Sequence, residues 1–197
     1  MIKIGITGGI SSGKTTASLQ FKRKGDAFIF HADKESKKHL KKSRNLQKKI
    51  IHIFGNEVTK NNKLDFELLA KKAFSDSINH KILNGIMWPE IYILINNAYN
   101  EQKNKGYKFF IVDAAVIFEA NFQSFFNKTI LIIAKKDLRI QRAIKRNNLP
   151  LESIQNRISL QMSDNIKKKM ADYILINNTT ETNLINKIDK IYLDLLN

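Results

Sequence analysis

Half of the glycines in this chain lie in one short stretch, and this stretch constrains the fold more than any other feature. The chain has 8 glycines, and Gly5, Gly8, Gly9 and Gly13 fall within nine residues. The mostly apolar run Lys3–Thr7 predicts a buried strand that ends in a tight turn. Glycines in such a turn let the backbone curl so that successive N–H groups point inward. A strand that leads through this turn into a helix is typical of α/β folds.

The same stretch contains a complete phosphate-binding pattern. Residues Gly8–Thr15 match G-x-x-x-x-G-K-S/T in full, and the predicted helix Thr15–Lys22 follows at once. The loop N–H groups and the positive end of this helix would hold phosphate oxygens. Lys14 would reach the β- and γ-phosphates of ATP, and the Thr15 hydroxyl would bind Mg²⁺. The residues expected to contact the nucleotide here are Gly9, Ile10, Ser11, Ser12, Gly13, Lys14, Thr15 and Thr16.

Apolar runs alternate with segments of helical periodicity along the rest of the chain. Further strands are predicted at Ala27–Phe30, Phe109–Val112, Thr129–Ala134 and Tyr173–Ile176. Further helices are predicted at 34–54, at Asn79–Met87, at Asp137–Asn147, at Leu151–Lys169 and at Thr182–Leu196. Another helix is predicted to begin after an N-cap at Asp65 and to end at Ala73, and helical character continues after Pro89 to about Lys103. Pro89 would interrupt a helix or start a new one, and Asn148-Leu149-Pro150 would end another. The alternation predicts a three-layer α/β/α fold around a central five-stranded parallel sheet.

Two aspartates follow predicted strands, as the phosphate loop does. Asp33 comes just after the second strand, and Asp113 ends the third. Functional groups of parallel sheets lie beyond the carboxyl ends of the strands, so we expect both carboxylates beside the loop. Asp33 is the candidate catalytic base for an acceptor hydroxyl. Asp113 is a candidate Mg²⁺ ligand, directly or through water.

The distribution of arginine favours a kinase. The chain has 34 basic residues but only six arginines, and four of these lie between Arg139 and Arg157. Arg142 and Arg146 are four apart on one helical face, which Arg139 extends. Arginine makes the forked phosphate contacts that lysine cannot reproduce. The segment is therefore expected to be a lid that closes over the phosphates, with Arg142 catalytic and Arg146 binding the nucleotide.

Other classes of phosphate-loop protein fit less well. The letters of the guanine-specific N-K-x-D pattern occur at Asn186–Asp189, but inside the predicted C-terminal helix rather than after a strand. The D-x-x-G switch pattern is missing at Asp113. Another nucleoside or nucleotide kinase remains an alternative, which a panel of acceptors would test.

Composition bounds the remaining possibilities. The net charge of +16 would suit nucleic-acid binding, but 28 lysines spread over the whole chain indicate a compositional bias instead. A basic nucleic-acid-binding protein with a degenerate nucleotide site is thus a weak alternative. The chain has no cysteine, and it shows neither a signal peptide nor a run long enough to span a membrane. We expect one cytoplasmic domain that is a monomer or a weak homo-oligomer.

Taken together, the motifs resemble the dephospho-coenzyme A kinase family over nearly the whole chain. The matching segments are Thr7–Thr16, His31-Ala32-Asp33, Phe54-Gly55, Leu64-Asp65, Leu83–Pro89, Asp113 to Glu119, Arg142–Arg146, Arg157–Gln161 and Ala171-Asp172 with Asn177. The resemblance implies transfer of the γ-phosphate of ATP to the 3′-hydroxyl of the dephospho-coenzyme A ribose, with Asp33 as the base. It places a P-loop kinase core at about 1–33, 105–135 and 171–197, an acceptor-binding helical insertion at about 34–104 and a lid at about 136–170. Asn177 would lie near the adenine.

The sequence departs from the family pattern at several positions. His31 replaces an aspartate, Phe66 an arginine, Trp88 a histidine and Arg139 a glutamine, and 115–117 is Ala-Val-Ile rather than Pro-Leu-Leu. Phe66 and Trp88 fall in the acceptor-binding region. We interpret both aromatic side chains as core residues rather than as stacking partners of the acceptor.

Overall fold

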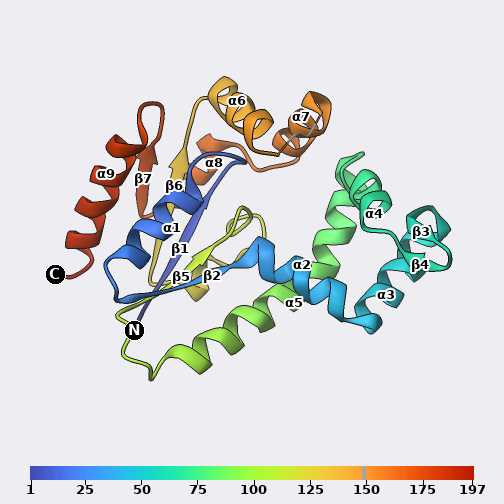
Figure 1. Ribbon diagram of the computed structural model, residues 1–197, viewed down its shortest axis with the longest axis horizontal. Coiled ribbons are helices and arrows are strands. Elements are labelled where there is room, and N and C mark those ends of the chain that lie inside the picture. The colour runs from blue at the N-terminus through green and yellow to red at the C-terminus, as the bar shows by residue number, and fades with distance from the viewer. Residues whose placement is uncertain (148–149) are drawn as a thin grey trace.

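A parallel sheet of five strands forms the centre of the protein in a computed structural model that describes residues 1–147 and 150–197 (Figure 1). The strands are β1 (Ile2–Gly8), β2 (Ala27–His31), β5 (Phe109–Asp113), β6 (Lys128–Ile133) and β7 (Tyr173–Ile176). Their order is β2-β5-β1-β6-β7, and every pairing is parallel. All five predicted strands are therefore confirmed, because short apolar runs between turn signals are the signature of strands buried on both faces.

Helices cover the sheet and extend from it. They are α1 (Lys14–Arg23), α2 (Ala32–Lys42), α3 (Arg44–Phe54), α4 (Phe66–Ala73), α5 (Ser77–Gln102), α6 (Lys136–Asn147), α7 (Leu151–Ser159), α8 (Asp164–Lys168) and α9 (Glu181–Asp194), with short 3₁₀ turns η1 (Gly55–Val58) and η2 (Gln123–Phe125). None of the helices in the described part of the chain combines the length and the apolar character that a membrane crossing requires.

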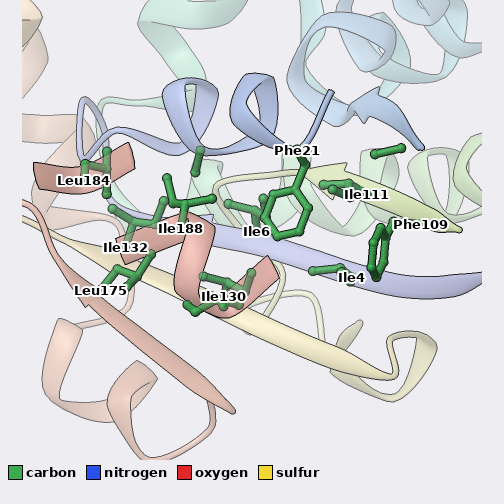
Figure 2. Packing of buried hydrophobic residues seen from close by; sticks show 13 residues of the cluster. Ile4, Ile6, Phe21, Phe109, Ile111, Ile130, Ile132, Leu175, Leu184 and Ile188 are labelled. Carbon is green, nitrogen blue, oxygen red and sulfur yellow. The ribbon is translucent and has the colours of Figure 1, made fainter. Parts of the chain in front are cut away.

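Alternating side chains of the strands build a core on each face of the sheet. On one face, Ile4 and Ile6 of β1 and Ile111 of β5 pack with Phe21 of α1 and Ile188 of α9 (Figure 2). On the other face, the intervening residues of β5 pack against α5 and the segment around α8; the buried members there include Phe110, Val112, Ile95, Ile117 and Phe118. Helices therefore cover both faces, and the three-layer architecture is confirmed.

The segment between β2 and β5 is a helical insertion with its own small core. The buried residues of this core are Leu40, Leu46, Ile50, Phe54, Val58, Leu64, Leu69, Ile86 and Met87. A two-stranded hairpin, β3 (Thr59–Lys60) and β4 (Lys63–Leu64), lies within it. The predicted N-cap Asp65 is confirmed, because its carboxylate accepts from the N–H groups of Glu67 and Leu68 at 2.9 Å each.

Several predicted helix boundaries are wrong. The helix predicted at 34–54 is two helices, since the Ser43 hydroxyl accepts from Leu46 N (3.3 Å) and caps the second one. In the same way, Ser163 caps α8, so the helix predicted at 151–169 is divided into α7 and α8. The break predicted at 148–150 includes residues 148 and 149, which lie outside the described part of the chain.

Pro89 does not end a helix, because α5 runs unbroken from Ser77 to Gln102. Proline normally clashes with the carbonyl four residues earlier. That residue is Gly85, and a Cβ placed on it would meet no atom within 4 Å, so the backbone has room to adjust. Figure 1 shows α5 changing direction partway along its length, as expected of a helix that absorbs a proline by bending.

Candidate active site

The strand order brings three predicted groups to one edge of the sheet. The central strand β1 ends in the glycine-rich loop, β5 beside it ends at Asp113, and β2 leads into Asp33 on the first turn of α2. His31 and Asp113 are register partners across β2 and β5. The predicted convergence of the loop with the two carboxylates is thus what the parallel topology produces.

The loop curls as the glycine pattern predicts. Gly13 precedes α1 with a left-handed φ of 111°, and Ser12 N donates to Gly9 O at 3.2 Å. Asn177, which follows β7, donates from Nδ2 to Ser12 O at 2.8 Å and so holds the loop from the edge strand on the far side of β6. Residues 11–16, which comprise the end of the loop and the start of α1, therefore line one cavity, and the positive end of a helix suits an anion there.

Replacing Gly13 with alanine is expected to damage this loop. The new Cβ would lie 2.5 Å from Asn177 Nδ2, and the left-handed φ of 111° is strained for any residue with a side chain. We expect ADP to bind roughly tenfold more weakly or worse, as titration calorimetry would measure. Gly25→Ala is the matched control, because Gly25 also has a positive φ (87°) but nothing lies within 4 Å of its Cβ position. Equal ADP affinity in both variants would contradict this account.

Lys14 lies at the electrostatic centre of the site. Its ammonium donates to the carbonyls of Gly8 (3.0 Å) and Gly9 (3.1 Å). Burial lowers the pKa of Lys14, the carboxylates of Asp33 and Asp113 oppose this shift, and the nearby cations Lys167 and Arg139 add to it. Two carboxylates and two further cations thus surround the lysine of the phosphate loop.

The pKa of Asp33 is raised, as expected of a carboxylate that accepts a proton during catalysis. Desolvation by the surrounding protein raises its pKa, the Lys14 ammonium lowers it, and Asp113 raises it further. The residue nevertheless remains exposed to solvent, so water screens part of this effect. The carboxylate therefore has a higher affinity for a proton than an ordinary aspartate, and an acceptor molecule can reach it.

Asp113 is surrounded by hydroxyl and imidazole groups. Its Oδ2 lies 3.4 Å from Thr15 Oγ1, 3.3 Å from Ser18 Oγ and 3.2 Å from His31 Nδ1. A Mg²⁺ ion bound with a nucleotide usually takes one or two protein oxygens and fills its other positions with water and phosphate. Among the described residues, no group of three or more His, Asp or Glu side chains is arranged to hold a metal ion. The pair of Thr15 hydroxyl and Asp113 carboxylate does fit a nucleotide-bound Mg²⁺.

A cavity of about 320 Å³ opens over the loop. Its walls are Ser11, Ser12, Gly13, Lys14, Thr15, Thr16, Arg142, Arg146, Asn177, Glu181 and Leu184. Arg142 Nη1 donates to the Asn177 carbonyl at 3.2 Å, which joins α6 to the end of β7. A larger hollow of about 440 Å³ in the insertion contains none of the loop residues, so the smaller cavity is the candidate nucleotide site.

The departures from the family pattern have different surroundings. Phe66 is 38% exposed, with Lys41 Nζ 5.8 Å from its ring centroid, so the core assignment for Phe66 is wrong. It is the first residue of α4, directly after the N-cap, and the residues of α4 that are buried are Leu69 and Ala73. Trp88 is partly buried.

Several buried or half-buried polar residues near the site were not predicted as site residues from the sequence. Gln161 Oε1 accepts from Ile10 N of the loop at 3.1 Å. Lys167 is fully buried and pairs with Glu119 at 2.7 Å, and Arg139 is only 8% exposed. Gln161 and Glu119 belong to the matching motifs, which is the one signal that could have singled them out. For Lys167 no such signal existed in a chain with 28 lysines.

Comparison with known proteins adds a family to this geometry. The sequence profile of the family described as dephospho-CoA kinase matches residues 2–183. The curated dephospho-CoA kinase of Chlamydia caviae is 30% identical over 193 residues, which are 98% of this chain and 95% of that protein.

Solved structures agree with the sequence comparison. The structure of TT1252 from Thermus thermophilus matches with a TM-score of 0.82 and 26% identity, covering 100% of this chain and 98% of that one. The dephospho-CoA kinase from Campylobacter jejuni matches with a TM-score of 0.66 and 25% identity over 98% and 96% of the two chains. The profile covers well over half of the sequence, and the match covers at least 95% of each of these three proteins. The chain is therefore a member of the dephospho-CoA kinase family.

Proposed function

We propose that this chain phosphorylates the ribose 3′-hydroxyl of dephospho-coenzyme A with ATP, which is the final step of coenzyme A synthesis. The observation that carries the proposal is the convergence of a complete phosphate loop with Asp33 and Asp113 at one sheet edge, in a chain of this family. The family uses ATP as its co-substrate. No observation favours either alternative, another nucleoside or nucleotide kinase or a nucleic-acid-binding protein.

The chemistry follows from the groups around the loop. The acceptor oxygen forms a bond to the γ-phosphorus while the bond from this phosphorus to the bridging oxygen breaks, and ADP leaves. The acceptor loses its hydroxyl proton to the Asp33 carboxylate, whose raised pKa favours proton uptake. The positive charge of Lys14 stabilises the negative charge on the phosphoryl group while this group is transferred. Catalysis is thus mainly positioning and electrostatic stabilisation.

Mg²⁺ is part of the proposal. Thr15 and Asp113 would hold the ion, together with the phosphates of ATP. Thr15 Oγ1 and Asp113 Oδ2 lie 3.4 Å apart at the N-terminus of α1. When bound, the ion supplies positive charge to the β- and γ-phosphates. Ser18 donates to the same Asp113 oxygen at 3.3 Å and would help to orient the carboxylate.

The remaining assignments concern the nucleotide and the regions of the chain. Arg142 and Arg146 line the cavity beside Ser11–Thr16, which supports their roles as a catalytic and a nucleotide-binding residue. Asn177 would lie near the adenine. The helical insertion of about 34–104 would bind the acceptor, and about 136–170 would act as the lid of this single domain. We further propose a cytoplasmic location and a monomeric or weakly associating chain.

The direct test combines purified protein with Mg-ATP and a panel of acceptors. Dephospho-coenzyme A, adenosine, deoxynucleosides and nucleoside monophosphates would be compared at equal concentration, with ADP and phosphorylated product quantified by chromatography. We expect product mainly from dephospho-coenzyme A. Preferential phosphorylation of another acceptor would replace the proposed substrate while leaving the kinase assignment intact. Binding to polynucleotides without any phosphorylation would overturn both.

A further inference from the structure

Arg139 rests directly on the phosphate loop. It lies on the first turn of α6, and its residue surface is only 8% exposed. A Cβ placed on Gly9 would lie 1.6 Å from Arg139 Nη1 and 2.8 Å from its Cζ. The guanidinium thus occupies the space that a side chain at Gly9 would need. The second glycine of the loop is required here for close approach of an arginine.

This buried guanidinium has unused donors. Its Nε is buried and has no hydrogen-bond partner. In residues 1–147 and 150–197, each ion pair that is found joins other residues, so no carboxylate compensates Arg139. A buried charge without a partner is costly, and natural proteins keep one where a ligand compensates it. The unpaired donors of Arg139 therefore indicate that an anionic ligand binds beside the loop.

The neighbouring charges favour the same conclusion. Arg139 and Lys167 both lie close enough to Lys14 for their charges to lower its pKa. Lys167 already has Glu119 as a partner at 2.7 Å. Arg139 and Lys14 remain as the two cations that lie against Gly9, since Lys14 Nζ donates to the Gly9 carbonyl at 3.1 Å. A phosphoryl group is the anion that both a forked guanidinium and an ammonium can bind.

Arg139 is separated from the two arginines predicted on the same helix face. Arg142 and Arg146 line the cavity over Ser11–Thr16, whereas Arg139 is not among its walls. It lies instead at the Gly9 end of the loop, where the Lys14 ammonium also donates to the Gly9 carbonyl. The charges of Asp33 and Asp113 act on this same ammonium, so under the proposed function Arg139 belongs with the groups around the transferred phosphate.

We propose that Arg139 is a further catalytic residue, which donates hydrogen bonds from its guanidinium to the γ-phosphoryl oxygens of ATP during transfer. The proposal rests on the proposed kinase function. It adds Arg139, as a ligand of the phosphoryl group that is transferred, to the roles proposed for Arg142 and Arg146. Arginine contacts to a transferring phosphoryl group are worth roughly 10³-fold or more in kcat in related chemistry.

The test uses the full chain with Arg139→Gln and Arg139→Lys, and Lys145→Gln as the control. Lys145 is exposed on the same helix, so the control removes one charge without touching the loop. ADP and the non-hydrolysable analogue AMP-PNP are titrated calorimetrically without any acceptor, and kcat and KM are measured with acceptor present. We expect Arg139→Gln to lower kcat by roughly a hundredfold or more and to weaken AMP-PNP roughly tenfold. ADP affinity should change by less than about threefold.

The stability of the variants separates a catalytic role from a structural one. Removing a buried cation without a partner should leave the thermal midpoint of Arg139→Gln unchanged or raise it. Arg139→Lys keeps the charge but loses the fork, so kcat should recover only in part. Equal losses of ADP and AMP-PNP affinity together with a lower midpoint, or kinetics like those of the control, would overturn the proposal. The affinities for AMP-PNP and ADP are measured without acceptor, so they do not depend on which acceptor the enzyme uses. A wrong acceptor assignment would appear separately, as missing product with dephospho-coenzyme A.

Discussion

Asp33→Asn is expected to lower kcat for coenzyme A formation by about a hundredfold or more, because asparagine cannot take the acceptor proton. ADP affinity should change little, since Asp33 is absent from the walls of the nucleotide cavity. The measurement is steady-state kinetics with both substrates varied, together with calorimetric ADP binding. Asp137→Asn is the matched control, because Asp137 is exposed on α6 and has no place in the chemistry.

The pKa of Asp33 makes this prediction sharper. Its pKa is raised in the folded protein, chiefly by desolvation, so its ionised form is disfavoured by folding. The contribution of Asp33 to the unfolding free energy is greatest below the pKa that it has in the unfolded chain. It is lost as the pH rises through the higher pKa that it has in the folded protein. Near neutral pH, Asp33→Asn should therefore not lower the thermal midpoint. A variant that loses activity because it unfolds would contradict the assignment of Asp33 as the base.

The pH profile gives a second readout of the same residue. A base must be ionised to act, so kcat/KM should fall as pH drops through the pKa of Asp33 in the free enzyme. Since that pKa is raised, the fall should begin at a higher pH than for an ordinary aspartate. In Asp33→Asn this limb of the profile should disappear. A limb that persists in the variant would belong to another group and would remove Asp33 from this role.

The strands and the phosphate loop could be predicted because their signals are local. Each strand is a short apolar run, and the loop follows from glycines that must adopt conformations such as the φ of 111° at Gly13. Parallel topology then brings Asp33 and Asp113 to the loop without any long-range information in the sequence. These elements were predicted correctly for physical reasons that act within a few residues.

Helix boundaries and buried cations depended on information that the sequence alone does not provide. Ser43 and Ser163 are N-caps, but a serine within a helical pattern does not by itself indicate a helix boundary, because serine also occurs inside helices. Pro89 stays inside a helix that bends. Arg139 and Lys167 are buried by contacts with loops far away in the chain, and a lysine-rich composition hides which cations are inside.

Glu119→Ala is expected to cause the largest loss of stability. Lys167 is fully buried, and its ammonium lies 2.7 Å from Glu119 Oε1 and 3.4 Å from the Ala115 carbonyl. Without the carboxylate, a buried cation loses its counter-charge, which costs about 3–5 kcal/mol of unfolding free energy. Glu119 Oε1 also accepts from Met162 N at 3.1 Å, so the segment that follows α7 loses a second contact. Urea unfolding followed by circular dichroism measures the change.

A double variant separates the charge from the packing. In Glu119→Gln with Lys167→Met, both charges are gone and most of the volume remains, so much of the lost stability should return. The exposed pair Lys72–Glu57 provides the comparison, because Glu57→Ala should barely change stability at a site open to solvent. If Glu119→Ala were as mild as Glu57→Ala, the pair would not hold the fold.

The buried pair also bears on the active site. Glu119 follows Asp113 on the same loop, and Gln161, one residue before Met162, holds Ile10 N of the phosphate loop at 3.1 Å. Loosening the segment after α7 should therefore weaken ADP binding in Glu119→Ala even at temperatures where the variant is folded. The double variant should regain ADP affinity along with stability. If it regained stability alone, the ion pair would serve the site directly rather than by anchoring this segment.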